Sequence, residues 1–140
     1  MSDLQAFFAQ NAAGNGTEDF IVSDRFKDGD GRAIPWKLRT MTEAENEEIR
    51  KSATRLAKGA NGAKVKETVP EEYLGKLVVA SVVFPDLKNA ELQKSYGVMG
   101  ADALVKKMLL AGEYSALVQK VQEINGFDRD ISTAVDEIKN

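Results

Sequence analysis

The sequence contains neither cysteine nor histidine, and each absence removes a class of function. Without cysteine the chain can form no disulfide framework and no thiolate metal site, which fits a reducing cytoplasm. Without histidine it lacks the most common general base, the usual partner of a serine nucleophile and the most common zinc ligand. An enzyme built on this chain would have to use carboxylates, lysine or tyrosine.

The chain also lacks a strong charge of one sign and a long apolar run. Its 19 basic and 22 acidic residues are interspersed and give a net charge of −3, without the basic stripe that nucleic acid demands. The longest apolar run, residues 77–84, is interrupted only by Ser81 and is far shorter than the ~20 residues that span a bilayer. The N-terminus has no basic lead, so we expect no secretory signal. We therefore expect neither a nucleic-acid partner nor a membrane partner.

With 140 residues the chain can bury a core without a disulfide or a metal, and we expect a single domain over 1–140. We divide it into an N-terminal helix and loop (1–16), a β-hairpin (17–41) and a helical part (42–140). The predicted fold class is α+β, with a small N-terminal β-hairpin packed on a mainly helical domain of about five to six helices.

The predicted hairpin joins a strand over 18–26 to a strand over 33–39 through the polar turn 27–32. Alternation places one set of apolar side chains on a common face of each strand. These side chains are Phe20, Val22 and Phe26 in the first strand, and Ile34, Trp36 and Leu38 in the second. Pro35 cannot donate to a ladder, so its strand is an edge or Pro35 lies on the unpaired side.

A capping box predicts that a helix follows directly. The hydroxyl of Thr42 can accept from the amide of Glu45, and the glutamate can reach back. Glu47 and Lys51 are spaced as an i,i+4 ion pair. We expect this surface helix to run toward Lys58 and to bury one narrow stripe. The stripe consists of Ile49, Ala53 and Leu56.

The small and glycine-bearing segment 58–68 predicts a mobile loop, with a domain linker as the alternative. A central, buried helix should begin at Pro70 and run to Phe84, because apolar residues cover almost all of its circumference. The valines also permit a strand over 77–84, since such runs are ambiguous by periodicity alone.

Further helices are expected near 88–95, 101–109 and 112–125, with Gly97 and Gly126 at two of the ends. A last helix and a short helix over 2–10 complete the prediction. The last helix would carry Ile131, Ala134, Val135 and Ile138, and the first would carry Leu4, Phe7 and Phe8 on one face.

Two acidic clusters could suggest chemistry, but neither has the required pattern. Asp24, Asp28 and Asp30 crowd the hairpin turn, yet an EF-hand aligned on Gly31 would place Phe26 and Lys37 at ligand positions. The glutamates of 43–48 are explained by capping and by the helix dipole. We therefore expect no catalytic residue, no metal and no cofactor. A carboxylate-based enzyme is the least favoured alternative.

Aromatic and methionine side chains are the candidates for partner binding. Either they cover one another and the helical core, or part of this surface binds another protein. The candidates are Phe7, Phe8 and Trp36, with Met99 and Met108 as adaptable surface if they are exposed.

Two blocks of the chain resemble the XkdN-like phage tail assembly chaperones. The first spans 24–50 and includes Phe26-Lys-Asp-Gly-Asp-Gly-Arg-Ala-Ile-Pro-Trp-Lys-Leu-Arg39. The second spans 73–93 and includes Leu77-Val-Val-Ala-Ser-Val-Val-Phe-Pro-Asp-Leu-Lys-Asn89, and it continues through Tyr96-Gly-Val-Met-Gly to residues 108–114. Neither block contains a catalytic motif.

The resemblance implies a non-catalytic protein of the host bacterial cytoplasm. Such a protein would bind the phage tape-measure protein and assist tail-tube assembly, with the tail-tube protein as a further partner. Its absence from the mature virion is also implied, and association of several copies is compatible with this role. The alternative is a structural tail component that is retained in the virion.

Overall fold

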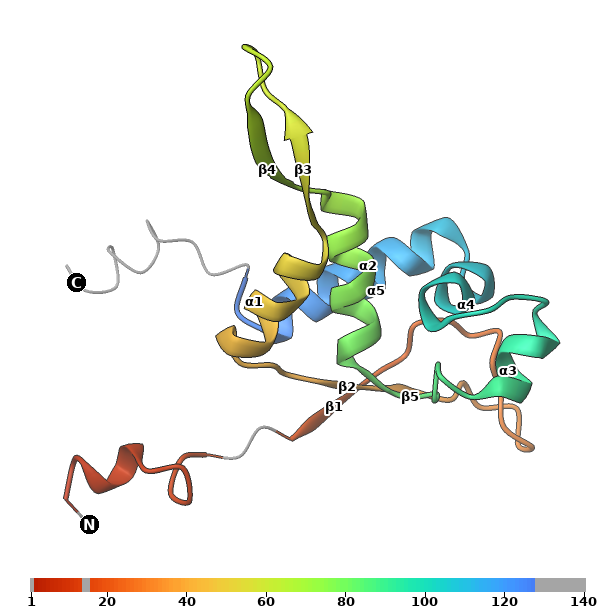
Figure 1. Ribbon diagram of the computed structural model, residues 1–140. Helices are drawn as coiled ribbons and strands as arrows, with labels where there is room; N and C mark the ends of the chain where they lie inside the picture. Colours follow the sequence, from red (N-terminus) through yellow and green to blue (C-terminus); the bar gives the residue numbers. More distant parts are fainter. Residues whose placement is uncertain (1, 14–15, 128–140) are drawn as a thin grey trace.

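The computed structural model describes residues 2–13 and 16–127 of the chain (Figure 1). Within these residues it contains a three-stranded antiparallel sheet, a separate two-stranded hairpin and five α-helices. The predicted α+β class is confirmed, with a hairpin near the N-terminus and a mainly helical remainder. None of the helices in this part of the chain is both long and apolar enough to cross a membrane.

The three-stranded sheet joins the predicted hairpin to a distant strand. Strand β1 (Thr17–Phe20) pairs with β2 (Trp36–Arg39), and β2 pairs on its other side with β5 (Val82–Phe84). The order is β1-β2-β5, so the strand that carries Trp36 is central. Pro35 lies just before this strand, where its missing amide interrupts no ladder.

The hairpin differs from its prediction in length. Strand β1 ends at Phe20, whereas we expected the first strand to reach Phe26. Residues 21–35 form an irregular connection with one isolated bridge between Lys27 and Ala33. The chain leaves the sheet because Val22 and Ser23 are buried and Arg25 extends to the helices, donating to the carbonyl of Met108 at 2.7 Å.

The capping box of α1 (Glu43–Ser52) is confirmed. The Oγ1 atom of Thr42 accepts from the amide of Glu45 at 3.3 Å, and the Glu45 carboxylate accepts from the amide of Thr42 at 3.4 Å. The predicted pair of Glu47 and Lys51 also forms, at 3.4 Å. The helix ends about six residues earlier than expected, because Ala53 is fully buried at the C-cap and a strand follows.

A second hairpin occupies the region predicted as the end of this helix and a loop. Strand β3 (Thr54–Lys58) pairs with β4 (Lys64–Thr68), and the hairpin projects away from the rest of the fold (Figure 1). Residues 59–63 form the turn, where Gly62 has φ +76°. The loop assignment of 58–68 was therefore wrong for its second half, and Leu56 lies on an exposed strand instead of a helical stripe.

The central helix begins where predicted and ends early. Helix α2 (Pro70–Ser81) starts with proline in its first turn, but the last three residues of the expected helix form β5. The buried hydroxyl of Ser81 donates to the carbonyl of Arg39 at 2.7 Å, which fixes the chain onto β2. The alternative of a strand over 77–84 is thus correct only for 82–84.

The remaining described helices follow the prediction. They are α3 (Ala90–Ser95), α4 (Ala101–Met108) and α5 (Ala111–Ile124). Gly97 and Gly126 follow two of them with positive φ, as expected for such termini. The predicted helix of Ile131, Ala134, Val135 and Ile138 lies outside the described residues. The predicted helix over 2–10 is reduced to a 3-10 turn, η1 (Gln5–Phe7).

The core forms where α2, α4 and α5 pack together against one face of the sheet. Its members are Val22, Trp36, Leu38, Leu77, Val78, Leu87, Leu104, Val105, Met108, Leu109, Leu117 and Val121. The ring of Trp36 packs beside Phe26 with centroids 6.4 Å apart. Helix α4 and its C-cap contribute four of these residues, and α5 contributes Leu117 and Val121.

Candidate interaction surfaces

The N-terminal segment exposes two of the predicted aromatic residues. It lies away from the helices (Figure 1), and its turn is stabilised locally by reciprocal hydrogen bonds between Ser2 and Gln5. Phe7 is 82% exposed, and Phe8 and Leu4 are also exposed. These residues neither cover one another fully nor join the core, so they remain accessible to another protein.

Met99 is the most exposed large apolar residue among the described residues, at 92%. It lies in the connector between α3 and α4, between Gly97 and Gly100, which both have positive φ. The side chain of Gln93 accepts from the amide of Gly100 at 2.9 Å and holds this connector against α3. Met99 therefore meets the condition of exposure that we set for it, and its role in binding a partner stays a prediction.

Trp36 and Met108 do not belong to this exposed set. Trp36 is 2% exposed and Met108 is 6% exposed, and both are members of the core. Alternation along β2 directs Trp36 inward together with Leu38. Their inclusion among the partner-binding candidates is corrected here, because buried side chains present no surface to a partner.

The second hairpin presents a surface that the sequence analysis missed. Leu56 lies opposite Lys66, and Lys58 lies opposite Lys64, so these four side chains share one face. Leu56 is 65% exposed. Arg50 and Lys51 at the end of α1 line the same pocket of about 430 Å³ as Leu56 and Lys66. We call Arg50, Lys51, Leu56, Lys58, Lys64 and Lys66 the basic face. The Asn-Gly pair at 61–62 is the turn signal that could have revealed this hairpin.

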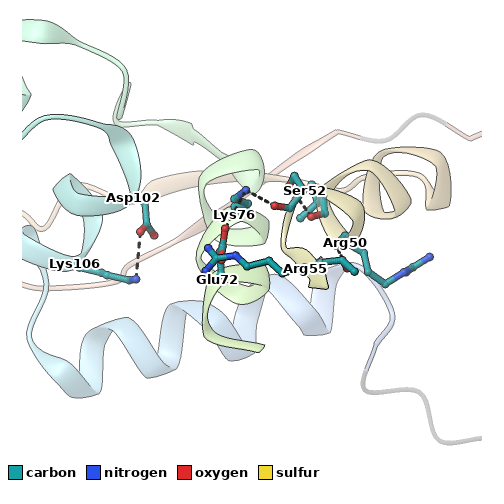
Figure 2. Close-up of polar contacts among 9 residues, drawn as sticks. Arg50, Ser52, Arg55, Glu72, Lys76, Asp102 and Lys106 are labelled. Atoms are coloured by element: carbon teal, nitrogen blue, oxygen red, sulfur yellow. Dashed lines mark hydrogen bonds and ion pairs between the residues drawn. The ribbon is translucent and has the colours of Figure 1, made fainter. Parts of the chain in front are cut away.

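The base of the hairpin is fastened to the body by polar contacts. The guanidinium of Arg55 pairs with Glu72 of α2 at 2.5 Å, and Lys76 donates to the carbonyl of Ser52 at 3.0 Å (Figure 2). The hydroxyls of Thr54 and Thr68 meet across the strands at 2.8 Å. These contacts fix the direction in which the hairpin leaves α2.

A groove of about 660 Å³ lies between β5, α2 and the start of α4. It is lined by Val79, Val82 and Leu87, and also by Lys76 and Asp102, whose side chains are labelled in Figure 2. Two of these charged side chains form ion pairs within the fold. Lys76 pairs with Glu72 at 3.4 Å, and Asp102 pairs with Lys106 at 3.2 Å. Asp86 and Lys88 also line this groove and form no ion pair within residues 2–13 and 16–127.

The acidic clusters of the sequence have structural roles. A carboxylate oxygen of Asp28 accepts from the amides of Asp30 at 2.9 Å and Arg32 at 3.0 Å, which closes the polar turn. In residues 2–13 and 16–127, no three acidic side chains gather into a group that could hold a metal ion.

Hydrogen bonds lower the pKa of three glutamates. In α1, Asn46 and Arg50 lower the pKa of Glu43, and Arg39 and the amide of Thr42 lower that of Glu45. Bonds from Arg25, Ser23 and the amide of Leu110 lower the pKa of Glu113 from 4.5 to about 2. These carboxylates stay ionised near neutral pH, so none of them resembles the raised-pKa acid of a catalytic pair.

Comparisons with known proteins agree with the fold. The sequence pattern of the family described as "Phage XkdN-like tail assembly chaperone protein, TAC" matches residues 4–139. The chain is 28% identical over 120 residues to the "Phage-like element PBSX protein XkdN" of Bacillus subtilis (strain 168), covering 85% of this chain and 81% of that protein.

A second relative has a solved structure. The chain is 29% identical over 120 residues to "Uncharacterized protein YqbN" of Bacillus subtilis (strain 168), covering 85% of this chain and 80% of that protein. A crystal structure of the protein YqbN superimposes with a TM-score of 0.77 at 25% identity, covering 91% of this chain and 99% of that chain. Because the family pattern extends over nearly the whole sequence, the chain belongs to the XkdN-like phage tail assembly chaperone family.

Proposed function

We propose that this protein binds the tape-measure protein of its phage and assists assembly of the tail tube without catalysing a reaction. Family membership carries the proposal, since the family consists of tail assembly chaperones. The exposed aromatic residues support it, because Phe7 and Phe8 lie outside the core on a segment that another chain can reach.

The physical reason for such a chaperone lies in its client. A tape-measure chain is long, helical and apolar along one face until the tube encloses it, and unpaired apolar helices aggregate. A small acidic protein with exposed apolar side chains covers such a face and keeps the complex soluble through its net charge of −3. Weak, repeated contacts let the tail-tube protein displace it as the tube grows.

Co-expression tests this function directly. The tape-measure protein of the same phage is produced in a bacterial host with this protein, or with an unrelated acidic protein of similar size as the control. We expect more soluble tape-measure protein, and its recovery in a pull-down, only with this protein. Equal solubility and no recovery would show that the tape-measure protein is not its client.

The proposed location follows from the same role. We place the protein in the host bacterial cytoplasm during assembly and outside the mature virion. Mass spectrometry of purified virions distinguishes this role from that of a structural tail component. A stoichiometric amount in washed particles would favour the structural role, whereas loss from the particles supports the chaperone.

A further inference from the structure

We propose that the basic face of the β3–β4 hairpin binds acidic, apolar-bearing segments of the tape-measure protein, an inference that rests on the proposed function. The segment 54–68 contains four cations and the single acid Glu67, so its formal charge is +3 in a chain of net charge −3. The remaining residues then carry −6. The segment that projects from the fold (Figure 1) thus has a net positive charge, whereas the rest of the chain is net acidic.

The hairpin does not contribute to the core of the fold. No side chain from Thr54 to Thr68 is buried, and the two strands pair with each other only. An isolated two-stranded hairpin is marginal in water, and this one is held chiefly by its base. An element that leaves the body and adds nothing to the core is well placed to contact another molecule.

The arrangement of lysines on the hairpin destabilises the pairing of its two strands locally. Lys58 and Lys64 lie directly opposite each other, and like charges at such positions destabilise a strand pair. Within residues 2–13 and 16–127, neither lysine forms an ion pair, and the same holds for Lys66. A carboxylate placed between these ammonium groups would relieve the repulsion, so the arrangement favours an anionic partner.

The pocket at the base of the hairpin also favours an anionic partner. It is lined by Arg50, Lys51, Arg55 and Lys66, with no acidic residue among its lining side chains. The partners of Arg50 and Lys51 are exposed glutamates at 3.4 Å, and such surface pairs contribute little and exchange readily. Leu56 lines the same pocket and provides an exposed apolar contact beside these cations.

These features define the chemistry of the bound segment. It carries two or more carboxylates spaced to reach the lysines, and an apolar side chain that packs on Leu56. Nucleic acid fits less well, because the −6 carried by the rest of the chain repels a long phosphate backbone. A polypeptide segment contacts the hairpin alone and avoids that repulsion.

The test uses overlapping peptides that cover the tape-measure protein, and three forms of this chain. The first form is the natural chain, and the second carries Lys64→Glu and Lys66→Glu. The control carries Lys27→Glu and Lys107→Glu, two exposed lysines outside the hairpin with the same change in charge. The hairpin variant should fold, because a carboxylate at position 64 lies opposite Lys58. Circular dichroism and thermal unfolding verify this.

We expect the natural chain to bind a subset of peptides that is rich in acidic residues. The hairpin variant should lose affinity for them by about tenfold or more, while the control stays within about twofold. Binding by the natural chain should also weaken as salt rises from about 0.05 to 0.5 M. Leu56→Ser should weaken binding without changing its salt dependence.

Failure of the proposed function and failure of this inference give different results. If the natural chain binds no tape-measure peptide and does not recover the whole protein, the proposed function fails and this inference fails with it. If the natural chain and the hairpin variant bind equally, only the inference is overturned. The inference is also overturned if the hairpin variant differs from the natural chain in the molar mass measured by light scattering, since that would identify a second copy as the partner. It is likewise overturned if a 20-base-pair DNA duplex (about two helical turns) binds more tightly than the acidic peptides.

Discussion

At the scale of single residues, Arg25 and Glu113 show how a loop is connected to the helices. One nitrogen of the Arg25 guanidinium donates to Glu113 and to the carbonyl of Met108, both at 2.7 Å. The same carboxylate oxygen of Glu113 accepts from the amide of Leu110 at 2.8 Å, at the start of α5. One ionised group therefore fixes the irregular segment after β1 and caps a core helix.

Because of the contact between Arg25 and Glu113, we expect the stability of the folded chain to depend on pH. The pKa of Glu113 falls from 4.5 to about 2 on folding, chiefly through its hydrogen bond from Arg25. A lowered pKa stabilises the folded state above pH 4.5, and this contribution is lost as the pH falls toward 2. Glu113→Gln should therefore be less stable than the natural chain at neutral pH, and the difference should shrink toward pH 2. Denaturant unfolding at several pH values measures this.

A second glutamine substitution serves as the control. Glu91 is exposed at the start of α3 and forms no ion pair within the described residues. Glu91→Gln removes the same charge without removing the bond to Arg25. Identical pH profiles for the two variants would show that the contact with Arg25 does not stabilise the folded state.

At the scale of elements, the two ends of α1 were predictable to different degrees. The start was evident from the sequence, since Thr42 and Glu45 have the spacing and the chemistry of a capping box. The end was not evident, because Ile49, Ala53 and Leu56 maintain a helical spacing past Ser52. The helix ends because Ala53 is buried and the chain turns into β3, which is a tertiary effect.

The cap gives a prediction for this helix. Thr42→Ala removes the hydroxyl that accepts from the amide of Glu45, and it should lower the free energy of unfolding by about 1 kcal/mol. Thr42→Ser keeps a hydroxyl and should cost much less. Urea unfolding of both variants measures the difference. If the two variants lose the same free energy of unfolding, the threonine methyl group is the cause, which would contradict the capping role.

Strand β5 shows a second limit of sequence reasoning. Val82, Val83 and Phe84 continue the apolar run of α2, and nothing local separates them from the helix. Their conformation is set by pairing with β2 and by the bond from Ser81 to Arg39, both of which are distant in sequence. The helices α3, α4 and α5 were predicted well because apolar periodicity is a local signal, and so are the glycines at positions 97 and 126.

The exposure of the partner-binding candidates could be predicted only in part for the same reason, and their role in binding stays a prediction. The exposure of Phe7, Phe8 and Met99 follows from segments with few neighbours, whereas the burial of Trp36 and Met108 depends on packing between distant elements. The basic face escaped prediction because its residues come from α1, β3 and β4, and their grouping exists only after the hairpin forms.

At the scale of the whole molecule, the core is spatially separate from the exposed phenylalanines of the N-terminal segment. The core lies among α2, α4, α5 and the sheet, while Phe7 and Phe8 lie on the N-terminal segment (Figure 1). Folding stability and partner binding should therefore respond to different substitutions.

This separation is tested by changing both phenylalanines. The pair Phe7→Ser and Phe8→Ser should shift the melting temperature by no more than about 2 °C, because exposed side chains contribute little to folding. The same variant should recover less tape-measure protein in a pull-down. Ile21→Ser, another exposed apolar position, is the control. Full recovery by the double variant would exclude the N-terminal segment from the binding surface.

The projecting hairpin has a consequence for the evolution of such proteins. Since no side chain from Thr54 to Thr68 is buried, substitutions there leave the packing of the scaffold unchanged. Selection can then adjust the charges at positions 58, 64 and 66, whose lysines form no ion pair within the described residues, with little loss of folding stability. One scaffold can in this way carry hairpins of different charge.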